Sequence, residues 1–273
     1  MNKFFVISAI VVITVIFSAC QKIIEINLAD AKPVIVIEAT MTNGKEPFTV
    51  LISKTSPYFG TSKKELISGA KVSLRVENGR PKYFTEQSPG IYKMEKIAAF
   101  VNNWYIVDVE YEGTTYSARS YLHAQVPIVD ITISHFDGLG FLDSGYKINC
   151  FIRDPVNIEN FYRIKVYIDE KAVNNDGEID LYSDKLFDGK VIGLVQHSST
   201  VFQEADVVTV ELQAIDQAAY DYFSTLENIT GIEMIQSASP ANPISNFSNG
   251  ALGYFSAYSV DRKTVAIKDY LKN

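Results

Sequence analysis

The residue with the clearest chemistry in this 273-residue chain is Cys20, because of the segment that precedes it. Lys3 gives the N-terminus a positive charge, and residues 4–17 are apolar except for Ser8 and Thr14. Two small residues separate this run from the cysteine. A basic start, an apolar stretch and small residues before a cleavage point are typical of a secretory signal, and a cysteine at that point resembles the bacterial lipobox. The pattern predicts cleavage before Cys20 and attachment of lipid to its sulfur.

A membrane-spanning anchor and ordinary secretion are the alternatives for the same segment. The apolar run is shorter than the roughly 20 residues that a spanning helix requires, and no basic cluster follows it. The lipobox resemblance implies three acyl chains, such as palmitate, on the mature N-terminus. Since two membrane-binding signals already give stable anchoring, we expect the lipid on Cys20 to be the membrane contact.

The other residues with reactive side chains are not spaced for catalysis. Cys150 lies in the alternating run 146–152 and shares a face with apolar residues, so the pattern predicts a small core residue. His123, His135 and His197 lack the spacing of a zinc site, and we expect them in loops or on strand surfaces. The sequence also lacks a nucleophile elbow and a phosphate-binding glycine loop.

The segment 174–180 faintly resembles a calcium-binding loop. Three of its side chains fall where an EF-hand places ligands, with Gly177 at the tight turn. The first and twelfth positions, however, hold Ala172 and Ser183 instead of acids. A hairpin turn therefore explains the segment better than a calcium site.

The charge of the chain argues against several classes of partner. It has 32 acidic and 25 basic residues and a net charge of −7, without any basic cluster. Binding to nucleic acid or electrostatic adsorption to anionic lipid is therefore not expected. The spacing of the acids does not single out a pair for glycoside hydrolysis. Aromatic-rich loops at 56–60 and 136–141 are interpreted as plugs at the ends of a β-sandwich, with ligand or partner contact as the alternative.

The elements that must position these residues are mostly strands. Short apolar or alternating runs recur along the chain between turn residues. They fall at 33–39, 48–53, 70–76, 83–85, 90–92, 104–109 and 115–118, and then at 128–134, 146–153, 161–168, 191–195, 207–214, 252–260 and 263–267. Between these sets, 121–127 is expected to be a linker. A helical pattern begins at Asp216, which can cap it, and Gly231 is a plausible stop.

The sequence therefore predicts an all-β protein with two β-sandwich-like domains after a lipoprotein signal peptide at 1–19. The N-terminal domain, of immunoglobulin or transthyretin type, is expected at 20–125. The C-terminal β domain is expected at 126–273, with one short helix near 216–228.

Several short segments, taken together, resemble one known family. They are the lipobox cysteine, 33–38, 68–72, 88–92, 115–118, 154–155, 160–163, 184–189, 245–250 and 252–255. In this order they are similar to the Bacteroidota lipoproteins classed as domain of unknown function family 4249, over nearly the whole mature chain. The resemblance implies an outer-membrane address and association with a TonB-dependent receptor, in uptake or surface assembly. It supplies no catalytic residue.

These observations predict a non-catalytic binding or accessory subunit, anchored to the outer membrane through Cys20 and without a cofactor or metal. Two other classes stay open. A secreted or anchored hydrolase acting on glycans or peptides would need a cleft with two convergent carboxylates. A structural cell-surface adhesion module would show an exposed aromatic patch. The ligand and the face of the outer membrane are not specified by the sequence.

Overall fold

The structure is a computed structural model. It describes residues 33–44, 46–56, 64–95, 98–139, 143–173, 179–195, 200–230 and 242–271, which fall in one compact unit. Several predicted features lie outside these residues: the signal segment, Cys20, most of the calcium-like segment at 174–178, and His197. Among the helices of the described part, none is long and apolar enough to cross a membrane.

Strands make up most of the described chain. In the first half they are β1 (Ile35–Thr42), β2 (Phe48–Lys54), β3 (Glu65–Leu66), β4 (Lys71–Val76), β5 (Lys82–Tyr83), β6 (Thr85–Ser88), β7 (Ile91–Met94), β8 (Asn103–Tyr111) and β9 (Thr114–Leu122). In the second half they are β10 (Ile128–Phe136), β11 (Gly145–Arg153), β12 (Phe161–Ile168), β13 (Lys171–Ala172), β14 (Asp180–Ser183), β15 (Val191–Val195), β16 (Val207–Ile215) and β17 (Leu252–Ala266). The helical elements are the 3-10 turn η2 (Asp184–Leu186), α2 (Gln217–Thr230) and α3 (Ile267–Tyr270). The predicted all-β class is confirmed, together with the helix expected near 216–228.

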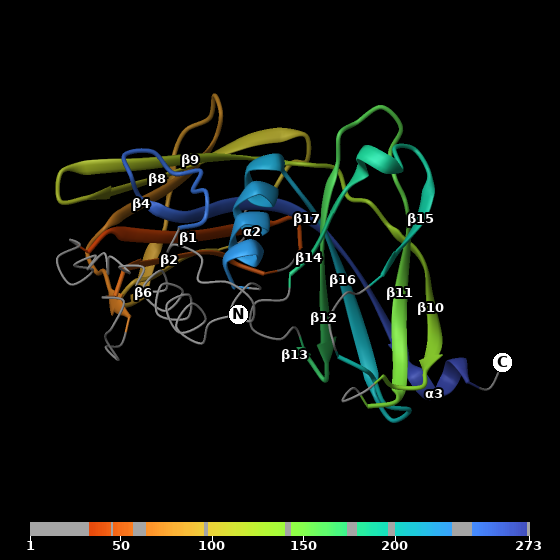
Figure 1. Ribbon diagram of the computed structural model, residues 1–273. Coiled ribbons are helices and arrows are strands. Elements are labelled where there is room, and N and C mark those ends of the chain that lie inside the picture. The colour runs from red at the N-terminus through yellow and green to blue at the C-terminus, as the bar shows by residue number, and fades with distance from the viewer. Residues whose placement is uncertain are drawn as a thin grey trace, which may run out of the picture. The chain divides into compact units, whose positions relative to one another are not determined.

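The strands form three sheets (Figure 1). The largest follows the order β13-β12-β16-β17-β1-β2-β7-β6, with β14 paired to β12 and β3 paired to β2. The others are β5-β4-β8-β9 and β10-β11-β15. One hydrophobic cluster joins β1, β2 and β7 to the four-stranded sheet, and a second joins β12 and β16 to the three-stranded sheet. Each half of the large sheet is therefore one layer of a β-sandwich.

Strand β17 crosses between the two halves of the large sheet. It is parallel to β1, from Val36 opposite Leu252 to Thr42 opposite Tyr258, and it is antiparallel to β16. The large sheet is thus continuous across the domain boundary expected near residue 125. The prediction of two strands at 252–260 and 263–267 is wrong, because Asp261 and Arg262 keep their ladder pairing with β16.

Gly253 makes the approach of β17 to β1 possible. Its φ is +97°, and a Cβ atom on this residue would collide with the carbonyl oxygen of Ile37. Only glycine adopts this conformation without strain and leaves room for the neighbouring backbone. Gly253 therefore permits the close approach of β17 to β1.

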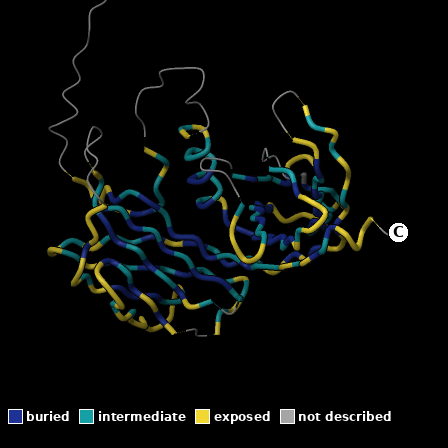
Figure 2. The backbone as a smooth tube through the Cα atoms, turned by 90° about the horizontal axis from the view of Figure 1, so that it is seen from below, coloured by how far each residue is buried: buried dark blue, intermediate teal, exposed yellow. Residues whose placement is uncertain are grey.

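The buried residues follow the middle of the strands, and the exposed ones gather at their ends (Figure 2). Cys150 is 2% exposed in the second cluster, so its predicted role as a core residue is confirmed. Burial raises the pKa of the Cys150 thiol to about 12, which leaves it protonated at neutral pH and without nucleophilic character. A third cluster lies under α2, where Ala219, Tyr222 and Phe223 pack against Phe161.

Candidate functional site

The two histidines in the described part of the chain do not form a metal site. His123 is partly buried and its ring contacts that of Tyr121 with the centroids 4.8 Å apart; burial lowers its pKa. His135 lies exposed on β10, with Nδ1 3.1 Å from a carboxylate oxygen of Asp137. Neither belongs to the group of potential metal ligands among the described residues, which consists of Asp154, Asp184 and Asp188.

The best candidate for a binding site is a cleft of about 450 Å³ at the first turn of α2. Its walls come from four segments that are far apart in sequence. They are Trp104 on β8, Arg119 on β9, Asp216, Gln217, Ala218 and Asp221 at the start of α2, and Asn246 in the loop before β17. The cleft therefore joins residues from both of the domains predicted from the sequence.

Trp104 provides the aromatic surface of this cleft, and it is the single tryptophan of the chain. The guanidinium carbon of Arg119 lies 4.6 Å from the centroid of the indole ring, and the ring of Tyr121 meets the indole edge-on at 5.2 Å. A guanidinium over an indole face is a favourable cation–π contact. Arg119 is exposed and Trp104 is partly exposed, so both can contact a ligand.

The carboxylate of Asp216 has a structural role in this cleft, because both of its oxygens accept backbone N–H groups. One carboxylate oxygen accepts the N–H of Ala219 at 3.0 Å and caps α2, as the sequence predicted. The other accepts the N–H of Tyr121 at 2.9 Å and ties the helix to β9. Asp216 is 3% exposed, and burial raises its pKa even though these N–H donors act to lower it.

The loop before β17 closes the free edge of β9. Ser117 and Ser248 exchange hydrogen bonds, with Ser248 N–H donating to the Ser117 carbonyl and Ser117 N–H donating to Ser248 Oγ, each at 2.9 Å. Asn246 bonds the backbone of Phe255 through both ends of its amide. Both ends of the Asn246 amide are therefore occupied, and this residue only lines the cleft. The side chains available to a ligand are Trp104, Arg119 and the exposed side chains of α2.

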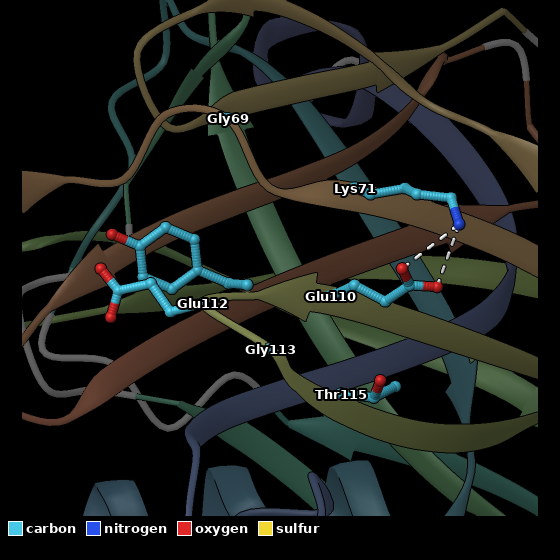
Figure 3. Close-up of a pocket in the computed structure, with 7 residues that line it drawn as sticks. Gly69, Lys71, Glu110, Glu112, Gly113 and Thr115 are labelled. Atoms are coloured by element: carbon cyan, nitrogen blue, oxygen red, sulfur yellow. Dashed lines mark hydrogen bonds and ion pairs between the residues drawn. The ribbon is translucent and has the colours of Figure 1, made fainter.

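A second hollow, of about 300 Å³, lies at the turn between β8 and β9 (Figure 3). Lys71 and Glu110 point toward one another across it, with the ammonium nitrogen 3.1 and 3.2 Å from the two carboxylate oxygens. Both side chains are more than half exposed. Such pairs contribute little to stability. Tyr111 gives this hollow an aromatic side chain as well, but Lys71 and Glu110 pair with each other, whereas the Arg119 guanidinium of the α2 cleft lies over the indole of Trp104.

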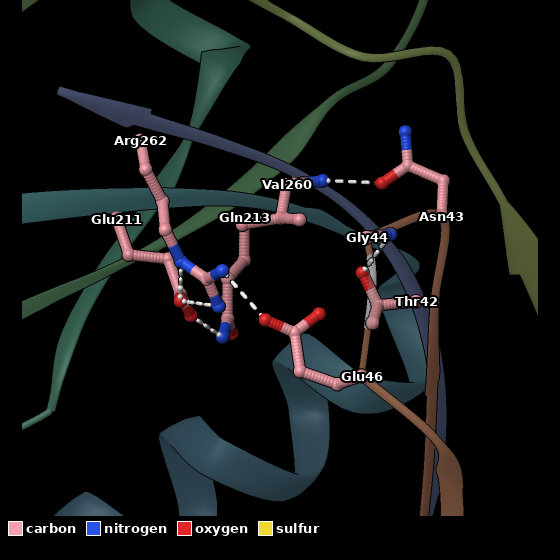
Figure 4. A network of polar contacts seen from close by, with 8 residues as sticks. All are labelled: Thr42, Asn43, Gly44, Glu46, Glu211, Gln213, Val260 and Arg262. Atoms are coloured by element: carbon pink, nitrogen blue, oxygen red, sulfur yellow. Dashed lines mark hydrogen bonds and ion pairs between the residues drawn. The ribbon is translucent and has the colours of Figure 1, made fainter. Parts of the chain in front are cut away.

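A polar network crosses the large sheet where the β1–β2 turn meets β16 and β17 (Figure 4). Glu211 is 2% exposed and accepts hydrogen bonds from Arg262 Nε at 2.7 Å and from Gln213 at 2.5 Å. Arg262 also donates to Glu46 at 2.5 Å, and the Asn43 side chain accepts the N–H of Val260 at 2.9 Å. The bond from Gln213 to Glu211 lies within β16, and the contacts of Arg262 and Asn43 join two strands or a strand and a turn. We therefore assign the network to the fold and not to ligand binding.

Sequence reasoning did not find the α2 cleft. The signals for it were the single tryptophan and the segment 245–250, which sequence analysis noted only as part of the family resemblance. Of the aromatic-rich loops, 57–60 and 140–141 lie outside the described residues, and Leu139 is 74% exposed.

Comparison with known proteins assigns this chain to a protein family. No curated protein matches the sequence. A solved two-domain fibronectin type-III segment from chicken tenascin is similar at 10% identity and a TM-score of 0.21, over 67% of this chain and 91% of that one. The model of the family described as domain of unknown function DUF4249 matches residues 21–264. The chain therefore belongs to the DUF4249 family.

Proposed function

We propose that this protein is a non-catalytic binding subunit of the cell envelope, held in the outer membrane of a Bacteroidota cell by a lipid on Cys20. The observation that carries the binding function is the cleft around Trp104, which combines an indole, a guanidinium and the polar side chains of α2. Its volume of about 450 Å³ lies within the range of about 300–1,000 Å³ that small-molecule sites occupy. The anchor is proposed from residues 1–20 of the sequence.

The bonding of Asp216 supports binding over hydrolysis. A general acid must present its proton to the substrate within hydrogen-bond distance, whereas both oxygens of Asp216 accept backbone N–H groups. Asp221 is then the carboxylate of the cleft that remains for a ligand. The raised pKa of Asp216 is the observation that favours the hydrolase alternative, but the position of its oxygens favours a structural role.

The proposed partner is a TonB-dependent receptor of the outer membrane, as the family resemblance implies. Affinity purification of the tagged native protein from solubilised membranes tests this. We expect the wild type to recover an outer-membrane transporter. Repeated recovery of the protein alone would count against the proposed accessory role.

The cleft can be tested separately, because Trp104 is the single fluorescent tryptophan. Maltohexaose and tryptic peptides of casein serve as probes of the glycan and peptide classes. We expect one class to change the Trp104 emission saturably in the wild type and at least tenfold more weakly in Arg119→Ala. Lys71→Ala, at the hollow of Figure 3, is the matched control and should behave as the wild type. Equal responses of Arg119→Ala and the wild type would exclude the cleft as the binding site.

A further inference from the structure

Three aspartates from two loops converge at one end of the second sandwich. Asp154 directly follows β11, whereas Asp184 and Asp188 lie between β14 and β15. One oxygen of each carboxylate lies within 4.8 Å of the others. Asp154 and Asp184 are 2% and 3% exposed, and Asp188 is exposed. Ca²⁺ binds oxygens at about 2.3–2.6 Å, so oxygens on its opposite sides are separated by about this spacing.

Hydrogen bonds hold the carboxylates in position without neutralising them. Asp154 accepts the Tyr162 phenol at 2.5 Å and the N–H of Gly189 at 2.9 Å, and Asp188 accepts the N–H of Asn157 at 2.8 Å. Among the described lysines, arginines and histidines, none forms an ion pair with the three acids. Burial, followed by the charges of Asp154 and Asp188, raises the pKa of Asp184.

Asn160 provides an independent indication of a ligand. It is 3% exposed, and its side-chain oxygen is buried without a hydrogen-bond partner. Its backbone N–H donates to Asp184 Oδ2 at 2.8 Å, and its carbonyl accepts the N–H of Asp184 at 3.1 Å. The residue that carries the orphaned oxygen is thus bonded to the carboxylate cluster through both of its backbone groups. A buried polar atom is normally satisfied, and an amide oxygen is a ligand that Ca²⁺ accepts.

We propose that Asp154, Asp184, Asp188 and the side-chain oxygen of Asn160 form a Ca²⁺ site. The donor set consists of oxygens, which a hard divalent cation prefers over nitrogen or sulfur. The cation supplies the positive charge that the described chain does not bring to this cluster. It also fastens the loop after β11 to the turn before β15. The site is separate from the α2 cleft, so it stands whether or not the proposed function holds.

Terbium luminescence and calorimetry on the chelator-treated mature protein test the site. Tb³⁺ replaces Ca²⁺, and Tyr162, which contacts Asp154, can sensitise its emission. We expect saturable Tb³⁺ emission that Ca²⁺ displaces at least tenfold better than Mg²⁺, and binding heat with CaCl₂ alone.

The informative variant is Asp188→Asn, because the new amide oxygen can still accept the Asn157 N–H while the charge is lost. We expect its affinity for Ca²⁺ to fall at least tenfold. Asp137→Asn removes a 96% exposed acid elsewhere on the surface and should leave the affinity unchanged. Absence of Ca²⁺ binding at millimolar concentration in the wild type, or unchanged binding in Asp188→Asn, would overturn the proposal.

Discussion

Glu211 in the large sheet and Asp184 in the loops are buried to nearly the same extent, 2% and 3% exposed, but their surroundings differ. Glu211 faces Arg262, whose nitrogens lie 2.6 and 2.7 Å from one of its oxygens. Asp184 faces two further carboxylates and a backbone N–H. A buried charge is stable only when it is paired or coordinates a metal. The first region therefore has its compensating charge within the sheet. Among the described basic residues none pairs with the second, where the proposed Ca²⁺ would bind.

The largest effect is expected at the junction of β1 and β17. Gly253→Ala should lower the free energy of unfolding by about 4 kcal/mol, because left-handed strain and a backbone collision add. Gly113→Ala is the matched control: its φ is also positive, at +76°, but nothing lies within 4 Å of the new methyl group. Urea denaturation of both variants measures the difference. Similar losses would show that strain alone, and not the close strand approach, makes Gly253 necessary.

The second largest effect is expected when Arg262, the cation that pairs with the buried Glu211 carboxylate, is removed. Arg262→Met should cost about 2 kcal/mol, since it leaves a buried carboxylate without its cation. This is less than for a fully buried pair because Arg262 is 45% exposed. Lys71→Met breaks the exposed pair of Figure 3 and should leave the urea midpoint unchanged. Equal midpoints for Arg262→Met and Lys71→Met would contradict the contrast between the two regions.

Asp216 is a third buried acid. N–H groups and a hydroxyl stabilise its charge, where Glu211 has the cation of Arg262. Asp216→Ala should cost about 1.5 kcal/mol through loss of the helix cap. Thermal unfolding followed by circular dichroism measures this loss, and Asp221→Ala in the same helix is the control. A loss confined to ligand binding, with stability unchanged, would instead support a catalytic or ligand-contacting role for Asp216.

The smallest effect is a pH dependence of the loop cluster without divalent cations. The pKa of Asp184 is raised above its ordinary value of 3.8, mainly by burial, so the folded state binds this proton more tightly than the unfolded state does. The associated stabilisation is complete below pH 3.8 and is lost as the pH rises through the raised value. Asp184→Asn removes it, so the stability of the wild type relative to this variant should fall over that range. Urea titrations at several pH values measure the trend, and a relative stability that rises with pH would contradict it.

Much of the fold could be predicted because strand periodicity and turn residues are local signals. The alternation of residues 146–152 placed Cys150 correctly in the core, and Asp216 was correctly predicted as a cap. The parallel pairing of β1 with β17 could not be predicted, because its partners are more than 200 residues apart in sequence.

The sites were harder to predict for the same reason. The cleft joins Trp104 and Arg119 to the start of α2, and no local spacing links these segments. The faint calcium pattern in the sequence covers 174–180, but Asp180 is the first residue of β14, and the carboxylate cluster contains Asp184 instead. The segments at 154–155, 160–163 and 184–189 were noted only as parts of a family resemblance. Their convergence is a property of tertiary structure.

The measurement that most directly tests the proposed envelope function is the intact mass of the mature protein extracted from native membranes. The account predicts a chain that begins at Cys20 and carries a diacylglyceryl group on its sulfur and an acyl group on its amine. A mass that corresponds to unmodified Cys20, or to a chain that retains residues 1–19, would contradict lipid anchoring and with it the proposed place of this protein in the outer membrane.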